Sequence, residues 1–188
     1  MIPRLVTQRL VMRGWHDDDR APYAAINADP AVMEHFPGML TAEQSSAMVD
    51  RMISHWTDNG FGLWAVEKTA TAELIGFVGL MAPAWEMPFT PCVEVGWRLA
   101  QSAWGHGFAP EAAKAALAWG FENVDLPNDE IVSYTTVSNA KSRRVMEKLG
   151  LMHDALDDFD HPMLPEWAGR RHVLYRINRR QFEATRHL

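Results

Sequence analysis

The chain has 188 residues, of which 47% are apolar and 22% charged, and its formal net charge at pH 7 is −6. This composition is ordinary for a soluble globular domain, and it excludes a disordered chain and the clustered basic surface of a nucleic-acid-binding protein. No apolar run reaches the ~20 residues of a membrane helix, residues 1–9 lack the apolar core of a signal peptide, and Cys92 is the only cysteine. We therefore expect one cytoplasmic domain over residues 1–188, with neither membrane nor nucleic acid as a partner.

The first third of the chain predicts one strand followed by helices. Residues 9–13 have the pattern of a strand, and the acidic run before the next segment is typical of the start of a helix over 18–28. Pro30 predicts a second short helical turn. The sequence Thr-Ala-Glu-Gln that begins at residue 41 resembles a capping box, and it predicts a helix over 41–56.

Strands dominate the middle of the chain. Residues 61–67 and 73–80 are joined by a short turn and predict an antiparallel pair, and residues 92–99 alternate between apolar and other side chains. The remaining predicted elements are a helix over 110–123, strands over 130–137 and from 151, a helix over 139–150, an irregular acidic segment over 154–168, a strand over 171–177 and a short helix from 179.

This order of elements predicts an α/β or α+β domain with a mixed sheet. A helix crosses between the strand that ends at Leu99 and the strand that begins near Ile131. Ligands often bind at such crossings, outside the carboxyl ends of the strands.

A glycine-rich loop at that crossing is the most specific binding signal in the chain. Gly105 and Gly107 allow the backbone to approach a ligand closely, and Pro110 opens the next helix. Neither Phe108 nor Ala109 has a side-chain acceptor that could cap this helix, so its first N–H groups have no local partner. We therefore expect an anion site that binds a phosphorylated cofactor.

Three segments together resemble the GNAT superfamily of N-acetyltransferases. They are Val93-Glu-Val-Gly-Trp-Arg-Leu99, Trp104-Gly-His-Gly-Phe-Ala-Pro-Glu-Ala-Ala113 and Asn139-Ala-Lys-Ser-Arg-Arg-Val-Met-Glu-Lys-Leu-Gly150. The branch they resemble most is that of the ribosomal-protein N-terminal (Rim-type) acetyltransferases. The resemblance implies a mixed, mostly antiparallel sheet of about six or seven strands, with the fourth and fifth strands splayed apart and about four flanking helices. It also implies acetyl-CoA as cosubstrate.

The same resemblance implies where acetyl-CoA binds. The amides of the loop would face its diphosphate, the backbone of Leu99 would pair with the pantetheine arm, and the amide of Asn139 would bond to the arm, although Asn139 also suits a helix N-cap. Arg143 or Arg144 would meet the 3′-phosphate. The implied cofactor-binding residues are Leu99, Trp104, Gly105, His106, Gly107, Phe108, Ala109, Asn139, Ser142 and Arg143.

Glu94 is the candidate general base. Amines are mostly protonated near pH 7, so acyl transfer to an amine needs a proton acceptor near the thioester. Glu94 lies on a sheet face beside Gly96, where no side chain would obstruct an approaching amine. The alternative is a surface salt bridge between Glu94 and Arg98. The weaker candidates for the base are Asp158, Glu166 and His172.

Ser142 is the candidate general acid. In the resembling branch this serine is proposed to protonate the CoA thiolate, whereas many other members use a tyrosine at the place held here by Met146. Water could supply the proton instead. Cys92 is an unsuitable acyl carrier, because nothing in the sequence places a base beside it.

The acceptor is expected to be a primary amine, at a peptide N-terminus or in a small molecule. The acidic segment 154–168 would favour a cationic amine if it overhangs the site, and the alternative is a solvated loop. Aromatic loops around Phe36 and Trp85 could wall the same cleft. The histidines have no metal-ligand spacing, so no metal is expected. A homodimer remains open, and the alternative function is a CoA-binding sensor without turnover.

Overall fold

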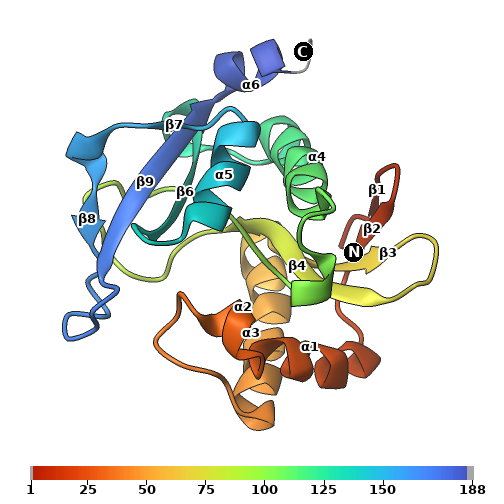
Figure 1. Cartoon of the computed structure of the whole chain (residues 1–188). Coiled ribbons are helices and arrows are strands. Elements are labelled where there is room, and N and C mark those ends of the chain that lie inside the picture. Colours follow the sequence, from red (N-terminus) through yellow and green to blue (C-terminus); the bar gives the residue numbers. More distant parts are fainter. Residues whose placement is uncertain (1, 186–188) are drawn as a thin grey trace.

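The computed structural model describes residues 2–185 and contains one continuous mixed sheet with helices on both faces (Figure 1). The strands are β1 (Leu5–Val6), β2 (Leu10–Arg13), β3 (Leu63–Lys68), β4 (Leu74–Met81), β5 (Glu94–Leu99), β6 (Glu130–Thr136), β7 (Met152–His153), β8 (Phe159–Asp160) and β9 (Arg171–Asn178). The α-helices are α1 (Arg20–Asn27), α2 (Pro30–Met33), α3 (Ala42–Asn59), α4 (Phe108–Asn123), α5 (Ala140–Lys148) and α6 (Arg179–Thr185).

The strand order is β1-β2-β3-β4-β5-β6-β9-β7, and β8 pairs with β9. Every neighbouring pair is antiparallel except β5 and β6, which run parallel. The predicted mixed and mostly antiparallel sheet is therefore confirmed. The structure has nine strands in residues 2–185, more than the six or seven predicted, because β1 and β8 have only two residues each, too few for a periodic signal. Its six α-helices include the predicted helical turn at Pro30, which is α2, and the predicted short helix from residue 179, which is α6.

The parallel pair β5–β6 splays apart almost as soon as it forms. Its only paired positions are Glu94 and Val132, next to a hydrogen bond from Val132 N to Val93 O of 2.9 Å. Beyond this point β5 continues to Leu99 and β6 to Thr136, but the two strands no longer pair with each other. The splay implied by the resemblance is present, and it opens the sheet in the middle.

Helix α4 starts two residues earlier than the sequence predicts. Its N-cap is Gly107, with φ +79°, and no side chain caps it. Pro110 is then the third helical residue, a position at which its missing N–H would have had no intrahelical partner. The capping box of α3 is confirmed by reciprocal bonds between Thr41 and Gln44, of 3.2 Å and 2.9 Å.

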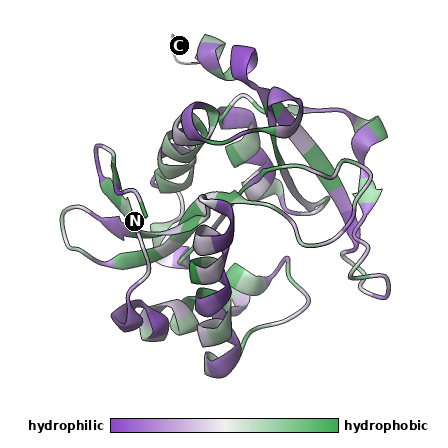
Figure 2. Cartoon of the chain, turned by 180° about the vertical axis from the view of Figure 1, so that it is seen from behind, coloured by the Kyte–Doolittle hydropathy of each residue, from purple (hydrophilic) through white to green (hydrophobic). Residues whose placement is uncertain are grey.

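The core lies on both faces of the sheet. Helices α1 to α3 pack on one face, and α4 and α5 pack on the other (Figure 1). On the α4 side the rings of Trp56, Trp64 and Trp119 contact one another at centroid distances of 4.8–5.8 Å. In Figure 2 the central strands are largely hydrophobic, whereas α1 and α3 carry many hydrophilic residues.

One detail of the predicted helix face needs correction. The four-residue spacing of Met48, Met52 and Trp56 in the sequence predicts one buried face, but Met48 is only partly buried whereas Val49 is completely buried. The buried face of α3 is therefore centred closer to Val49, and Met48 turns toward the cavity described below. No helix within residues 2–185 is both long enough and apolar enough to cross a bilayer.

Candidate active site

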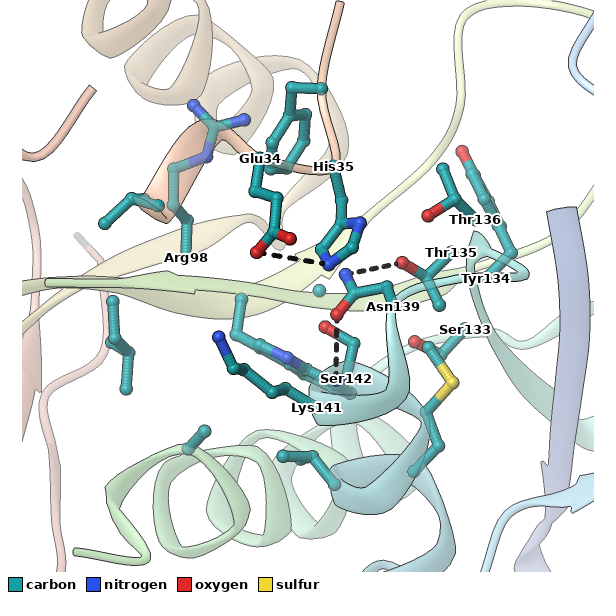
Figure 3. A pocket seen from close by; sticks show the side chains of 18 of the residues that line it. Glu34, His35, Arg98, Ser133, Tyr134, Thr135, Thr136, Asn139, Lys141 and Ser142 are labelled. Atoms are coloured by element: carbon teal, nitrogen blue, oxygen red, sulfur yellow. Dashed lines mark hydrogen bonds and ion pairs between the residues drawn. The ribbon is translucent and has the colours of Figure 1, made fainter. Parts of the chain in front are cut away.

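A cavity of about 970 Å³ opens where β5 and β6 separate. Its wall includes the C-terminal part of β5, the loop before α4, the middle of β6, the start of α5 and the segment that follows α2. Figure 3 shows side chains from these elements pointing toward a common space. The sheet thus supplies a site at the carboxyl ends of two parallel strands, as ligand sites in α/β proteins commonly are.

The splay leaves main-chain groups of β5 available to a ligand. Ala100 N donates to Ile75 O on β4 at 2.8 Å, and Val93 O accepts from Val132 N on β6. Because successive residues of a strand direct their main-chain groups to opposite sides, the N–H groups of Val95, Trp97 and Leu99 face the gap rather than β4. This edge can pair with an extended ligand that carries amides.

The loop before α4 provides a second set of free donors. The amides of Gly105, His106 and Gly107 have no hydrogen-bond partner within residues 2–185. Gly105 and Gly107 have φ of +78° and +79°, which other residues rarely adopt, and a Cβ on Gly105 would meet no atom within 4 Å. These free N–H groups and the uncapped start of α4 are donors of the kind that bind phosphate groups at helix N-termini.

Trp104 contributes to this site differently from the prediction. Its amide donates to Gln101 O at 3.0 Å, so it is not a free loop donor. Its indole Nε1 instead donates to Leu99 O at 2.9 Å, which ties the end of β5 to the loop. Lys141 lies over the indole ring, 4.3 Å from its centroid. Trp104 and Leu99 both line the cavity.

The sequence analysis missed the network that holds the loop in place. Arg9 Nη1 donates to His106 O at 2.8 Å, and the Arg9 guanidinium pairs with Glu111 in the first turn of α4. Thr7 Oγ1 also donates to Glu111, at 2.6 Å. His106 is therefore a loop member anchored from outside, and its side chain does not line the cavity. No spacing could have indicated this contact between residues about 100 positions apart.

Asn139 is the N-cap of α5. Its Oδ1 accepts from Ser142 N at 3.2 Å and its Nδ2 donates to Thr135 Oγ1 at 2.9 Å (Figure 3). The predicted cap is confirmed, and one Nδ2 hydrogen is left for a ligand. Ser142 lines the cavity, and its hydroxyl has no hydrogen-bond partner within residues 2–185.

The cationic side chains of α5 divide between two faces. Arg143 Nε donates to Tyr175 Oη at 3.3 Å and Nη1 donates to Val137 O at 3.2 Å, so this side chain does not reach the cavity. Lys141 and Arg144 do line it, and Lys148 extends the same face. The structure therefore places Arg144, rather than Arg143, on the wall of the cavity.

Glu94 lies at the last paired position before the strands diverge. Its side chain is buried, with 9% of the residue exposed, and its Oε2 has no hydrogen-bond partner within residues 2–185. Burial raises the pKa of Glu94 to about 8, and an interaction with the Tyr134 hydroxyl, the smaller of the two causes, acts in the opposite direction. A Cβ on Gly96 would meet only Glu94 Oε1, at 3.6 Å, so the approach to the carboxyl is open.

The exposed salt bridge weighed for Glu94 and Arg98 is wrong. Both side chains are buried, and Arg98 Nη1 donates to Asn27 Oδ1 on α1 at 2.7 Å. The strand projects the two side chains from one face, but Gly96 lies between them and they form no ion pair in residues 2–185. The Glu94 carboxyl and the Arg98 guanidinium therefore both face the cavity but do not pair with each other.

An aromatic wall faces Glu94 from β6, β9 and the loops. His161 and His172 lie 5.2 Å apart between ring centroids, and Tyr134 lies 6.3 Å and 6.0 Å from them. Burial lowers the pKa of both histidines. Trp85 packs on His161 at 5.3 Å. The Trp85 loop and His172 were among the predicted candidates, whereas Tyr134 and the position of His161 were missed by sequence reasoning. Tyr134 lies on the same face of β6 as Val132, which pairs with Glu94.

The acidic segment does not contribute its carboxylates to the cavity. Asp157 pairs with Arg176, Asp158 with His153, and Asp160 with Arg170 and Arg171. Glu166 does not line the cavity either, and the lining residues of this segment are His161, Met163, Leu164 and Trp167. The expectation that these acids would meet the acceptor is therefore wrong, because they balance nearby arginines and a histidine instead.

Two further observations concern Cys92 and metal-ligating side chains. Burial raises the pKa of Cys92 to about 11, which leaves a poorly nucleophilic thiol. Within residues 2–185 no group of three or more His, Cys, Asp or Glu side chains is placed to hold a metal ion. Of the weaker base candidates, only His172 lines the cavity, and its Nδ1 bonds to Arg170 O at 2.7 Å.

A family model of the acetyltransferase (GNAT) domain matches residues 9–152. The chain therefore belongs to the GNAT acetyltransferase family, whose members use acetyl-CoA. It is 30% identical over 149 residues to the uncharacterized protein YkkB of Bacillus subtilis, covering 79% of this chain and 84% of that one. It is 29% identical to the FsC-acetyl coenzyme A-N(2)-transacetylase of Aspergillus fumigatus, covering 96% and 78%.

Solved structures support the same family. An acetyltransferase from Agrobacterium tumefaciens has a TM-score of 0.76 at 28% identity, covering 95% of this chain and 96% of that one. The ribosomal-protein-S5-alanine acetyltransferase of Vibrio fischeri has a TM-score of 0.71 at 18% identity, covering 94% and 96%. At that identity the likeness shows the fold alone, so it does not assign this chain to the Rim-type branch.

Proposed function

We propose that this protein is an N-acetyltransferase that transfers the acetyl group of acetyl-CoA to a primary amine by direct attack in a ternary complex. The observation that carries this proposal is the buried carboxyl of Glu94, whose Oε2 has no hydrogen-bond partner within residues 2–185, at the point where β5 and β6 diverge. The free main-chain donors of β5 and of the loop before α4 lie along the same cavity. Acetyl-CoA supplies the activated acyl group as a thioester.

The residues of the chain have distinct proposed roles. The loop amides from Gly105 onward bind the diphosphate, the free edge of β5 pairs with pantetheine, and an N–H of Val95 or Leu99 polarises the thioester carbonyl. The amine nitrogen forms a bond to the carbonyl carbon, and its proton passes to the Glu94 carboxylate directly or through water. The carbon–sulfur bond breaks, and the thiolate takes a proton from Ser142 or from water.

The pKa of Glu94 suits this role. A carboxyl with a pKa of about 8 is a better proton acceptor once ionised than an ordinary glutamate, and a sufficient fraction is ionised near neutral pH. An ordinary surface carboxylate would be too weak a base to accept a proton from an ammonium group efficiently. Burial at the splay therefore tunes Glu94 toward the task.

The acceptor is a primary amine of a peptide N-terminus or of a small molecule. A structure of the same fold is the spermidine N-acetyltransferase of Vibrio cholerae in complex with CoA and spermine, with a TM-score of 0.71 at 18% identity. The name of the Aspergillus relative also refers to transfer from acetyl coenzyme A to a nitrogen. Both support a nitrogen acceptor. We propose the cytoplasm as the compartment.

The test is thiol release from acetyl-CoA by the purified chain with a panel of peptides, polyamines, aminoglycosides and amino acids. We expect release with at least one class, together with heat of CoA binding in calorimetry. Tight CoA binding with no release across the panel would instead identify a CoA-binding sensor. Absence of CoA binding would overturn both functions.

A further inference from the structure

Arg98 is a buried cation that lacks an anionic partner. It is 9% exposed and lines the same cavity as Glu94 (Figure 3). Its polar contacts are neutral: Asn27 Oδ1 at 2.7 Å, Met48 Sδ at 3.7 Å and an interaction with the Tyr23 hydroxyl. No carboxylate in residues 2–185 pairs with it, and its Nε has no hydrogen-bond partner.

This arrangement differs from that of two partly buried arginines elsewhere in the fold. Arg13 bonds to both Asp19 and Glu67, and Arg176 bonds to both Asp157 and Glu130. A buried charge without a counter-charge is costly, and proteins usually provide one. The guanidinium has five N–H donors in a planar fork that fits a carboxylate, and here only Nη1 has a close oxygen acceptor.

The surroundings of Arg98 support the recognition of an anion. Its guanidinium lies over the Phe36 ring at 4.2 Å and near the Phe77 ring at 5.8 Å, which fixes its plane. The acids of the segment 154–168 pair elsewhere, as described above. Glu34 does line the cavity, but its carboxylate lies 3.7 Å from His35 Nε2 and forms no ion pair with Arg98 in residues 2–185. The lining beside Arg98 includes the neutral side chains of Phe36, Met48 and Phe77.

We propose that the acceptor is an amine that also carries a carboxylate, and that Arg98 binds this carboxylate while the amine faces Glu94. This inference rests on the proposed acetyl transfer and narrows its acceptor to amino-acid-like amines. Glu94 and Arg98 are four residues apart on one extended strand, so their Cα atoms are separated by roughly 13 Å. Gly96 leaves the space between them free for the body of the substrate.

The experiment compares matched pairs of amines, each with and without the carboxylate. The purified chain is assayed for thiol release from acetyl-CoA with glycine, β-alanine, γ-aminobutyrate, 6-aminohexanoate and the common amino acids, each beside its carboxamide. We expect at least one acid to exceed its amide by about 10-fold or more in kcat/KM. The position of the best acid in the chain-length series then gives the separation between amine and carboxylate.

Arg98→Met tests whether this preference depends on the guanidinium. We expect this variant to have equal kcat/KM values for the acid and its amide. Its kcat/KM with the amide and its heat of CoA binding should stay within about 2-fold of the wild-type values. Arg98→Lys keeps the charge and should retain part of the ratio, which covers the case that Arg98→Met does not fold. Arg144→Met is the matched control, because it removes a cation at the CoA end and should weaken CoA binding without changing the ratio.

The outcomes separate this inference from the proposed function. Release with amides or polyamines, but with no preference for any acid, would overturn the carboxylate proposal and leave acetyl transfer intact. An equal loss with acid and amide in both Arg98 variants would assign Arg98 a structural role only. No release with any amine would overturn the proposed function, and the carboxylate proposal with it.

Discussion

In the half of the cavity beside α4 and α5, the groups available to a ligand are mostly main-chain amides, from Gly105 to Gly107 and along the free edge of β5. In the half beside α1 to α3, they are the side chains of Glu94 and Arg98 and an aromatic wall. Main-chain donors need only a backbone conformation, whereas side-chain groups need particular residues brought together from several elements. The first half, hereafter the CoA half, therefore suits a cosubstrate common to the family. The second half, hereafter the acceptor half, suits an acceptor particular to this protein.

The largest expected effect is on the acceptor half, from Glu94→Gln. Removing the proton acceptor should lower kcat/KM by about 10²-fold or more, because general bases contribute that much to proton transfer. The wild-type rate should rise with pH through a midpoint near 8, the pKa of Glu94, since only the carboxylate accepts a proton. The variant should lose this rise and keep its affinity for CoA.

The measurement is a pH–rate profile for both proteins with one acceptor, together with CoA calorimetry at each pH. An unchanged profile in Glu94→Gln would remove Glu94 from the mechanism. His172 would then become the next candidate for the base, because it also lines the cavity.

The next effect concerns the CoA half. Gly107→Val places a β-branched residue at φ +79°, a conformation that costs about 1–3 kcal/mol. We expect the Kd for CoA to rise about 5- to 100-fold, because the loop amides can no longer converge on the diphosphate. Gly60→Val is the matched control, since Gly60 has φ +74° at the end of α3, far from the loop in sequence. It should lower stability without weakening CoA binding.

Ser142→Ala tests whether a side chain also acts in the CoA half. The hydroxyl lines the cavity without a partner in residues 2–185. If it protonates the departing thiolate, kcat should fall about 10-fold, and less than for a full general acid because water can replace it. Ser138→Ala, which removes a nearby hydroxyl 3.4 Å from His35, is the control. Equal kcat values for wild type and Ser142→Ala would assign this proton to water.

Glu94 should also make stability depend on pH. Its pKa is raised in the folded state relative to the unfolded state, so the folded protein binds the proton more tightly, and stability falls as pH rises from about 4.5 to about 8. Glu94→Gln removes this loss, and we expect its Tm to exceed that of the wild type by several degrees at pH 9 and by little at pH 4.5. Thermal unfolding across this range measures the difference, and a constant difference would contradict a buried, titrating carboxyl.

The smallest expected effect comes from Asn139→Ala. Losing the bond from Ser142 N to this N-cap should cost about 1 kcal/mol of unfolding free energy, or about 2–4 °C in Tm. A change in Kd for CoA beyond about 2-fold would show that the Asn139 amide also binds the ligand. Asn139→Asp separates the two roles, because aspartate caps a helix equally well but lacks the amide donor.

The sequence by itself determined most of the elements and the loop of free main-chain donors before α4. Gly105, Gly107 and the uncapped helix are local features, and a ligand held by main-chain amides requires only such features. The position of Glu94 on an alternating strand was also predictable. The same local reasoning placed the start of α4 two residues late, since Pro110 is tolerated inside the first turn.

Only the tertiary structure decided which side chains meet in the acceptor half. The segment 154–168 supplies a wall of His161 and Trp167 rather than its carboxylates, because Asp157 and Asp160 find arginines nearby. Arg98 remains without an anion because α1 offers it Asn27 instead of an acid. Such pairings depend on distances between elements far apart in sequence, and these are set by packing around the splayed sheet rather than by any local pattern.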